Sequence, residues 1–300
     1  SIVTQSADDG EGGGRATTSI SSEDFPDLET VEVTQLRADE PGDNLIVEDL
    51  TTDIDLRVSA SDEDHSVQFT FDSGELSGND DTVDVTLDNA TVRFLTLTDP
   101  ADTSNDAETV NLTSTGGSNT LFFGAFLGGD ATTLKVDGDE GLFSFDTTGF
   151  SDASTADITV DASELGGSFT TGLDTDNGAN SFNIIGSAQE DRIEHTLDDV
   201  TIEADSLSST DVETHVVTND FTDAVTVEAD NLDGVETLGV RHTINVTTFE
   251  NVADGTALLL EGDGAQDEGD DEDAFRGDGT ANDVSNVAGL TAEFAGNPST

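Results

Sequence analysis

The chain has 300 residues, of which 67 are Asp or Glu and only 8 are Lys or Arg, so its formal net charge is -59. This balance excludes a basic surface for duplex nucleic acid or for an anionic membrane. Apolar residues still make up 33% of the chain, which is enough to build a core. Because Lys135 is the only lysine, most carboxylates lack a cation to pair with. We therefore expect a halophilic setting or bound calcium to relieve their repulsion.

Cysteine and methionine are both absent from the chain. Stability must then come from packing, strand ladders, ions or assembly, without disulfides. We expect a processed, secreted form that is located outside the cell or at the cell surface. Asn-x-Thr sequons at Asn89, Asn111 and Asn245 are compatible with glycosylation there. No apolar run approaches the ~20 residues of a membrane-spanning helix, so we predict no membrane insertion.

Residues 1–43 read as an extended N-terminal arm or linker. A Gly-rich, acidic stretch at 8–14 is followed by an apolar patch around Phe25 and by the alternating pair Val31 and Val33. Such a segment either packs back on the body of the protein or reaches a neighbouring molecule.

Residues 44–262 show the strand-and-turn pattern of an all-β protein. Short Val, Ile, Leu, Phe and Thr segments alternate with clusters of Gly, Asp, Asn and Ser. Similar segments recur every 24 residues, and a further one, Val200–Leu207, returns 25 residues later as Val225–Leu232. A fixed period of this size predicts a parallel β-solenoid with rungs of ~24 residues. The alternative is a β-sandwich with evenly spaced strands. The segments with the 24-residue period are Val110–Thr113, Leu134–Asp137, Ile158–Asp161 and Phe182–Ile185.

Residues 263–300 form an acidic, Gly-rich C-terminal segment, and the densest acidic run spans 261–273. Calcium takes six to eight oxygen ligands, which carboxylates interleaved with glycine supply from a single loop. We predict Ca²⁺ as a ligand, with a solvated acidic segment as the alternative. The candidate ligands in this run and in the turn at 137–141 are Asp137, Asp139, Asp263, Asp267, Asp270, Asp271 and Asp273.

No motif of a known catalytic site occurs in the chain, and we predict that it is not an enzyme. The four histidines, His65, His195, His215 and His242, lie far apart, and we expect them at solvated rung positions. A polysaccharide-cleaving solenoid needs carboxylates opposite Arg or Lys, and the repeat block offers only Lys135 and Arg192. Trp and Tyr are absent and the Phe residues are needed for the core, which disfavours a lectin or glycosidase.

The rungs at 109–113, 133–139 and 156–163 resemble the β-solenoid region of bacterial surface-layer (S-layer) proteins, of the type associated with calcium-binding RTX repeats. The resemblance covers roughly residues 80–200. It implies secretion, self-assembly on the cell exterior and order that depends on calcium. Residues 186–193 and 277–284 are partial matches to the Gly-rich RTX nonapeptide. They add Asp191, Asp278 and Asp283 to the candidate calcium ligands.

The sequence therefore predicts a secreted, self-assembling structural protein, a subunit of an extracellular surface layer or filament. Its expected partner is a second copy of itself, with cell-surface glycans as a further candidate. One alternative is the stalk or binding module of an adhesin or phage fibre. A solenoid enzyme that degrades polysaccharides is the other.

Overall fold

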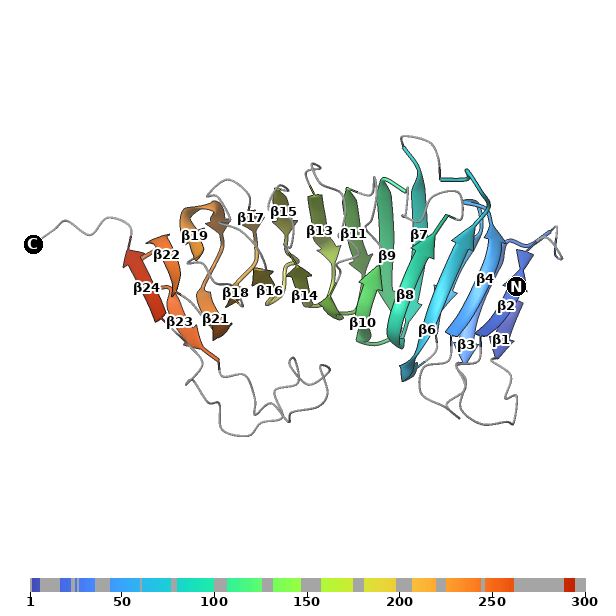
Figure 1. Cartoon of the computed structure of the whole chain (residues 1–300), viewed down its shortest axis with the longest axis horizontal. Helices are drawn as coiled ribbons and strands as arrows, with labels where there is room; N and C mark the ends of the chain where they lie inside the picture. Colours follow the sequence, from blue (N-terminus) through green and yellow to red (C-terminus); the bar gives the residue numbers. More distant parts are fainter. Residues whose placement is uncertain are drawn as a thin grey trace, which may run out of the picture.

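The protein is an elongated stack of short strands with its two termini at opposite ends (Figure 1). The computed structural model describes residues 2–5, 17–22, 25, 27–35, 44–59, 61–76, 80–99, 107–125, 132–146, 158–174, 181–197, 207–219, 225–243, 246–261 and 289–294. In these ranges almost every element is a β-strand, and helical backbone is confined to the 3-10 turn η2 (Ala229–Asn231) and to Ser22. No helix in the described ranges is long and apolar enough to cross a membrane.

Two long parallel sheets run the length of the molecule, and the chain alternates between them. Sheet A contains β1 (Ile2–Gln5), β3 (Thr30–Gln35), β5 (Asp55–Val58), β7 (Thr82–Asp88), β9 (Thr109–Thr115), β11 (Thr133–Gly138), β13 (Ile158–Leu165), β15 (Phe182–Ile185), β17 (Leu207–Thr210) and β20 (Leu232–Asp233), in that order. Sheet B contains β2 (Thr17–Ser21), β4 (Asn44–Leu50), β6 (Ser61–Phe71), β8 (Thr91–Thr98), β10 (Asn119–Ala125), β12 (Leu142–Asp146), β14 (Phe169–Asp174), β16 (Arg192–Leu197), β18 (Thr214–Asn219), β21 (Thr237–Thr243) and β23 (Ala257–Leu260). Strands β19 (Val225–Glu228), β22 (Val246–Val252) and β24 (Gly289–Phe294) form a third parallel sheet at the C-terminal end.

This arrangement is a parallel β-solenoid, so the predicted fold class is confirmed and the sandwich alternative is wrong. A sandwich joins antiparallel strands, whereas every strand pair described here is parallel. As far as β20 and β21, each rung contributes one strand to sheet A and one to sheet B, and the core lies between the two sheets.

The core follows from strict alternation along each strand. In β7 the side chains of Val83, Val85 and Leu87 are buried, while the Thr and Asp residues between them face outward. Parallel pairing places Val83 beside Val110 and Val85 beside Leu112 of the next rung. Like side chains therefore stack along the axis and exclude water from one continuous core.

The observed register confirms the 24-residue period at two steps and departs from it at others. Val110 pairs with Leu134, and Ile158 pairs with Phe182, each across 24 residues. Between these steps, Leu134 pairs with Val160, 26 residues on. A shift of two residues leaves the same face of the strand inward, so the pattern of apolar residues cannot reveal it.

The repeat at 200–207 and 225–232 also pairs differently from its sequence spacing. Leu232 lies beside Ser209, so the rungs are 23 residues apart there. Val225–Glu228 pairs with β22 in the third sheet instead of extending sheet A. A third sheet thus begins where the sequence still repeats.

The ladders reach into the predicted N-terminal arm. Strand β1 pairs with β3, β3 pairs with β5, and β2 pairs with β4 in parallel register. Val31 and Val33, the alternating pair noted in the sequence, are fully buried in β3. At the other end β24 pairs with β22, while residues 262–288 lie outside the described part of the chain.

Tight turns between the sheets depend on residues that accept unusual backbone angles. Gly138 at the end of β11 has φ +109°, and a β-carbon there would lie 2.0 Å from the carbonyl oxygen of Ser114 on the preceding rung. Gly255 in the turn before β23 has φ +99°, yet a β-carbon there would meet no atom within 4 Å.

These two glycines give a matched test of rung spacing. We expect Gly255→Ala to lower the free energy of unfolding by about 1–2 kcal/mol, the cost of an L-residue at positive φ. Gly138→Ala should cost at least about 2 kcal/mol more, because the rungs must separate to admit the methyl group. Urea unfolding of both variants measures the difference, and equal losses would contradict close contact at Gly138.

Candidate functional site

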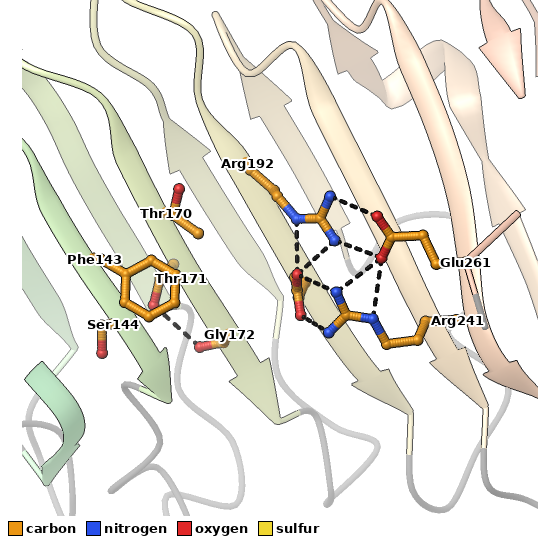
Figure 2. Close-up of a pocket in the computed structure, with 9 residues that line it drawn as sticks. Phe143, Ser144, Thr170, Thr171, Gly172, Arg192, Arg241 and Glu261 are labelled. Carbon is orange, nitrogen blue, oxygen red and sulfur yellow. Dashed lines mark hydrogen bonds and ion pairs between the residues drawn. The ribbon is translucent and has the colours of Figure 1, made fainter. Parts of the chain in front are cut away.

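A polar hollow of about 280 Å³ lies on the outer face of sheet B (Figure 2). The strands β12, β14, β16 and β21 contribute its walls, together with the residue that follows β23. Its lining residues are Phe143, Ser144, Thr170, Thr171, Gly172, Arg192, Glu194, Arg241 and Glu261.

Two arginines and two glutamates form a closed quartet along one side of this hollow. Arg192 donates from its Nη1 and Nη2 atoms to the two carboxylate oxygens of Glu261, at 3.1 and 2.8 Å. Its Nε donates to Oε1 of Glu194 at 2.7 Å. Arg241 donates to both oxygens of Glu194, at 2.7 and 3.1 Å, and to Oε2 of Glu261 from Nε and Nη2 at 3.0 and 2.8 Å. Each guanidinium therefore holds both carboxylates, with paired contacts that fix the plane of each group.

Strand geometry explains how the quartet assembles. Arg192 and Glu194 are two residues apart in β16, so both face outward while Ile193 between them is buried. Arg241 lies two strands away in β21, because β18 pairs with both β16 and β21. Glu261 is positioned by its backbone N–H, which donates to the carbonyl of Val240 at 2.9 Å.

Arg192 and Glu261 stay charged despite their partial burial. Burial by itself raises the pKa of Glu261, but the hydrogen bonds and charges of Arg192 and Arg241 outweigh it and hold this pKa below its ordinary value. Burial likewise lowers the pKa of Arg192, and contacts with Glu261 and Glu194 reverse the effect and raise it. Two positive and two negative charges cancel, so the quartet offers fixed hydrogen-bonding groups without net charge.

The sequence predicted only Arg192 of these four residues as a candidate cation, and not its partners. Arg192 and Glu261 are 69 positions apart, and no local motif connects them. The sequence analysis also assigned all Phe residues to the core. Phe143 instead lines the outer hollow, and Phe94 and Phe25 are 39% and 47% exposed.

A second polar group is buried inside the solenoid, where histidines were expected at solvated positions. That expectation is wrong for His195 and His215, which are each 1% exposed. Nε2 of His195 lies 2.9 Å from Nδ1 of His215, and Nε2 of His215 lies 2.9 Å from the hydroxyl of Ser209. The two ring planes are parallel to within 3° and their centroids are 5.2 Å apart, so the rings lie end to end along the hydrogen bond. The line of hydrogen bonds crosses the core from sheet B to sheet A.

Burial keeps both histidines uncharged. It lowers the pKa of His195 to about 4, and together with the neighbouring ring it lowers the pKa of His215 well below the ordinary value. Nδ1 of His195 is buried without a hydrogen-bond partner in the described residues. A histidine on an inward strand position fits the core only in its neutral form.

Asp191, a predicted calcium ligand, holds a turn together instead of facing solvent. It is 2% exposed, and its carboxylate accepts hydrogen bonds from the Phe169 N–H at 2.6 Å, from the Ser187 hydroxyl at 2.9 Å and from the Ser187 N–H. Burial raises the pKa of Asp191 more than these hydrogen bonds lower it. Asn119 joins rungs in the same way earlier in the solenoid, where its side chain accepts from the Ala90 N–H at 2.6 Å.

The other predicted calcium ligands are not brought together in the described structure. Asp137 and Asp139 are both exposed, at the end of β11 and in the turn that follows. Within the described ranges no three acidic or histidine side chains are grouped so that they could hold a metal ion. Seven of the predicted ligands lie outside the described residues, namely Asp263, Asp267, Asp270, Asp271, Asp273, Asp278 and Asp283.

The C-terminal end of sheet B exposes side chains that belong to the core stack. Leu258 and Leu260 of β23 pair with Leu238 and Val240 of β21, which are both fully buried. On the terminal strand the corresponding leucines are 42% and 45% exposed. In the described part of the chain β23 pairs only with β21.

Comparisons with models of known protein families, with curated proteins and with solved structures find no match to this chain.

The quartet gives a prediction on stability. Glu261→Gln removes one carboxylate and leaves two guanidinium groups facing a single negative charge. We expect a loss of about 1–3 kcal/mol in the free energy of unfolding, less than for a fully buried pair because Glu261 is partly exposed. Unfolding in urea, which does not screen charge, measures it.

The matched control is Glu32→Gln, at a carboxylate 3.5 Å from Arg57 whose side chains are 31% and 42% exposed. This substitution should cost less than about 1 kcal/mol. If Glu261→Gln lowers the free energy of unfolding no more than Glu32→Gln does, the quartet does not stabilise the contact between β23 and β16.

The histidine pair gives a prediction on pH. The unfolded chain binds a proton at His195 near pH 6.5, whereas the folded chain resists it until about pH 4. The free energy of unfolding therefore has its full value above pH 6.5 as far as His195 is concerned. It falls as the pH drops toward 4, and His195 alone accounts for a loss of roughly 3 kcal/mol.

Substituting both rings, as in H195L/H215L, should flatten this part of the stability curve. Leu173→Ala is the control, because it removes a buried side chain that pairs with His195 in register but carries no titratable group. It should lower stability at every pH and keep the slope. Urea unfolding in concentrated salt between pH 7 and 4 measures both, and an unchanged slope in H195L/H215L would refute the assignment.

Proposed function

We propose that this protein is a structural subunit that assembles head to tail through the ends of its solenoid, as part of an extracellular layer or filament. The observation that carries the proposal is the pair Leu258 and Leu260, core side chains left exposed on the terminal strand of sheet B.

The second copy is the occupant that fits this end best. Every strand of sheet B runs in the same direction, from β2 at one end to β23 at the other. A copy stacked along the axis therefore presents its β2 to the β23 edge in the parallel sense, and the ladder continues. The outer edges of β2 and β23, which have no strand partner in the described residues, gain one, and the exposed leucines become buried.

Charge sets the condition for assembly. Two copies that each carry a net charge of -59 repel one another strongly in dilute buffer. At about 1 M salt the Debye length is ~3 Å, and the contact between the two edges then dominates. The acidic run at 261–273, which follows β23 directly, supports a role for calcium in the same contact.

The location outside the cell is supported by the composition and by the resemblance to surface-layer solenoids. An acid-coated surface with a single lysine suits a salty medium, and repeat ladders supply rigidity without disulfides. Whether the assembly is a layer or a filament depends on contacts beyond the solenoid ends.

Replacing both leucines tests the proposal. We expect the wild-type chain to form polymers at about 1 M NaCl with millimolar calcium, detected by light scattering and electron microscopy. L258D/L260D should remain monomeric under the same conditions, because it places two carboxylates in the apolar contact. A parallel titration with a calcium chelator separates ion-dependent contact from simple screening.

The control A188D/Q189D adds the same two charges on an exposed turn in the middle of the solenoid. It should assemble like the wild type. A wild-type chain that stays monomeric in concentrated salt, both with and without calcium, would contradict the proposal. Equal assembly of L258D/L260D would show that the end of sheet B is not the contact.

A further inference from the structure

We infer that the hollow on the outer face of sheet B binds an uncharged sugar unit of a glycan chain. This inference does not depend on assembly through β23, since the hollow opens on the side of the solenoid and not at its end (Figure 2).

The shape of the hollow suits a single ring-sized group. Its volume of about 280 Å³ is at the lower end for ligand sites. Phe143 on β12 borders it, and Gly172 on β14 leaves the space in front of the strand open because it has no side chain. A sugar ring has a C–H face that packs on an aromatic ring and a rim of hydroxyl groups.

The opposite side of the hollow carries fixed hydrogen-bonding groups that match such a rim. Arg192 has five N–H groups, and its described contacts with Glu194 and Glu261 use four of them, so one N–H at Nη1 is left to donate. Oε1 of Glu261 accepts a single one of these bonds, from Arg192, and keeps a lone pair. Thr170 adds a hydroxyl. A vicinal diol both donates and accepts, and it fits a donor and an acceptor held side by side.

Pre-organisation makes these groups effective. The four side chains of the quartet hold one another in place, so little side-chain entropy is lost when a ligand binds. Free arginines and glutamates on the surface would have to be ordered first.

The charge balance selects an uncharged ligand. The quartet itself is neutral, and the protein around it carries a net charge of -59. An acidic sugar would be repelled by the surrounding carboxylates, while a cationic group offers no acceptor to the N–H that remains at Nη1 of Arg192. A neutral sugar incurs neither penalty.

The pKa of Glu261 favours binding over cleavage. Hydrolysis of a glycosidic bond needs a carboxylic acid that is protonated near neutral pH, which requires a raised pKa. The arginines lower the pKa of Glu261 instead. Glu261 therefore accepts a hydrogen bond from a hydroxyl group and does not supply the proton for cleavage.

The experiment presents the folded wild-type chain to an array of neutral oligosaccharides and to acidic oligosaccharides such as hexagalacturonate. Isothermal titration then measures the dissociation constant of each oligosaccharide that is retained. We expect one or more neutral oligosaccharides to bind and hexagalacturonate to bind at least tenfold more weakly. Retention of no neutral oligosaccharide, or a preference for the acidic ones, overturns the inference.

Two variants locate the site and keep all four residues of the quartet. Phe143→Ala removes the apolar platform, and Gly172→Val fills the hollow with a residue that is at home in a strand. Each should weaken binding at least tenfold while circular dichroism stays unchanged. Ser208→Val, an equally small change at an outward, exposed position of β17, should bind like the wild type. Normal binding by both Phe143→Ala and Gly172→Val, or equal loss in Ser208→Val, places the sugar elsewhere and refutes the assignment.

Discussion

The parallel backbone ladder is the constraint on which the rest of this structure depends. Each strand hydrogen-bonds to its counterpart one rung away, so a residue such as Val85 must lie beside Leu112 and each inward side chain is stacked on another. Pairing and core packing are thus set by the same register. A glycine such as Gly138 is required where the backbone of one rung touches the next, because the ladder leaves no room for a β-carbon.

The ladder also separates apolar from charged residues. Alternation sends most of the described Val, Leu, Ile and Phe residues between the sheets and leaves most of the described carboxylates outside, where water and salt screen them. Several buried polar residues are hydrogen-bonded to a neighbouring rung or to each other, although Nδ1 of His195 and the hydroxyl of Thr247 have no partner in the described residues. Asn119 and Asp191 accept backbone N–H groups of the preceding rung, and His195, His215 and Ser209 form a line across the core.

The same geometry accounts for the exposed end of sheet B and for the hollow on its outer face. A stack of inward residues has no natural end, so its last members, Leu258 and Leu260, remain partly exposed at β23. On the outside, residues three rungs apart in sequence become neighbours on one face. Arg192, Arg241, Glu194 and Glu261 meet there beside a hollow that no local sequence motif describes.

The sequence by itself determined the fold class, because a strand period of two and a rung period near 24 are properties of the chain that survive in the solenoid. It could not determine the register at Leu134, where a slip of two residues keeps the same face inward, nor the pairing of β1, β2 and β3 with the later rungs. Only the tertiary structure decided that His195 and His215 are buried and that Glu261 meets Arg192. Side-chain burial depends on which face a strand turns to the core, and contact across 69 residues depends on how many rungs lie between.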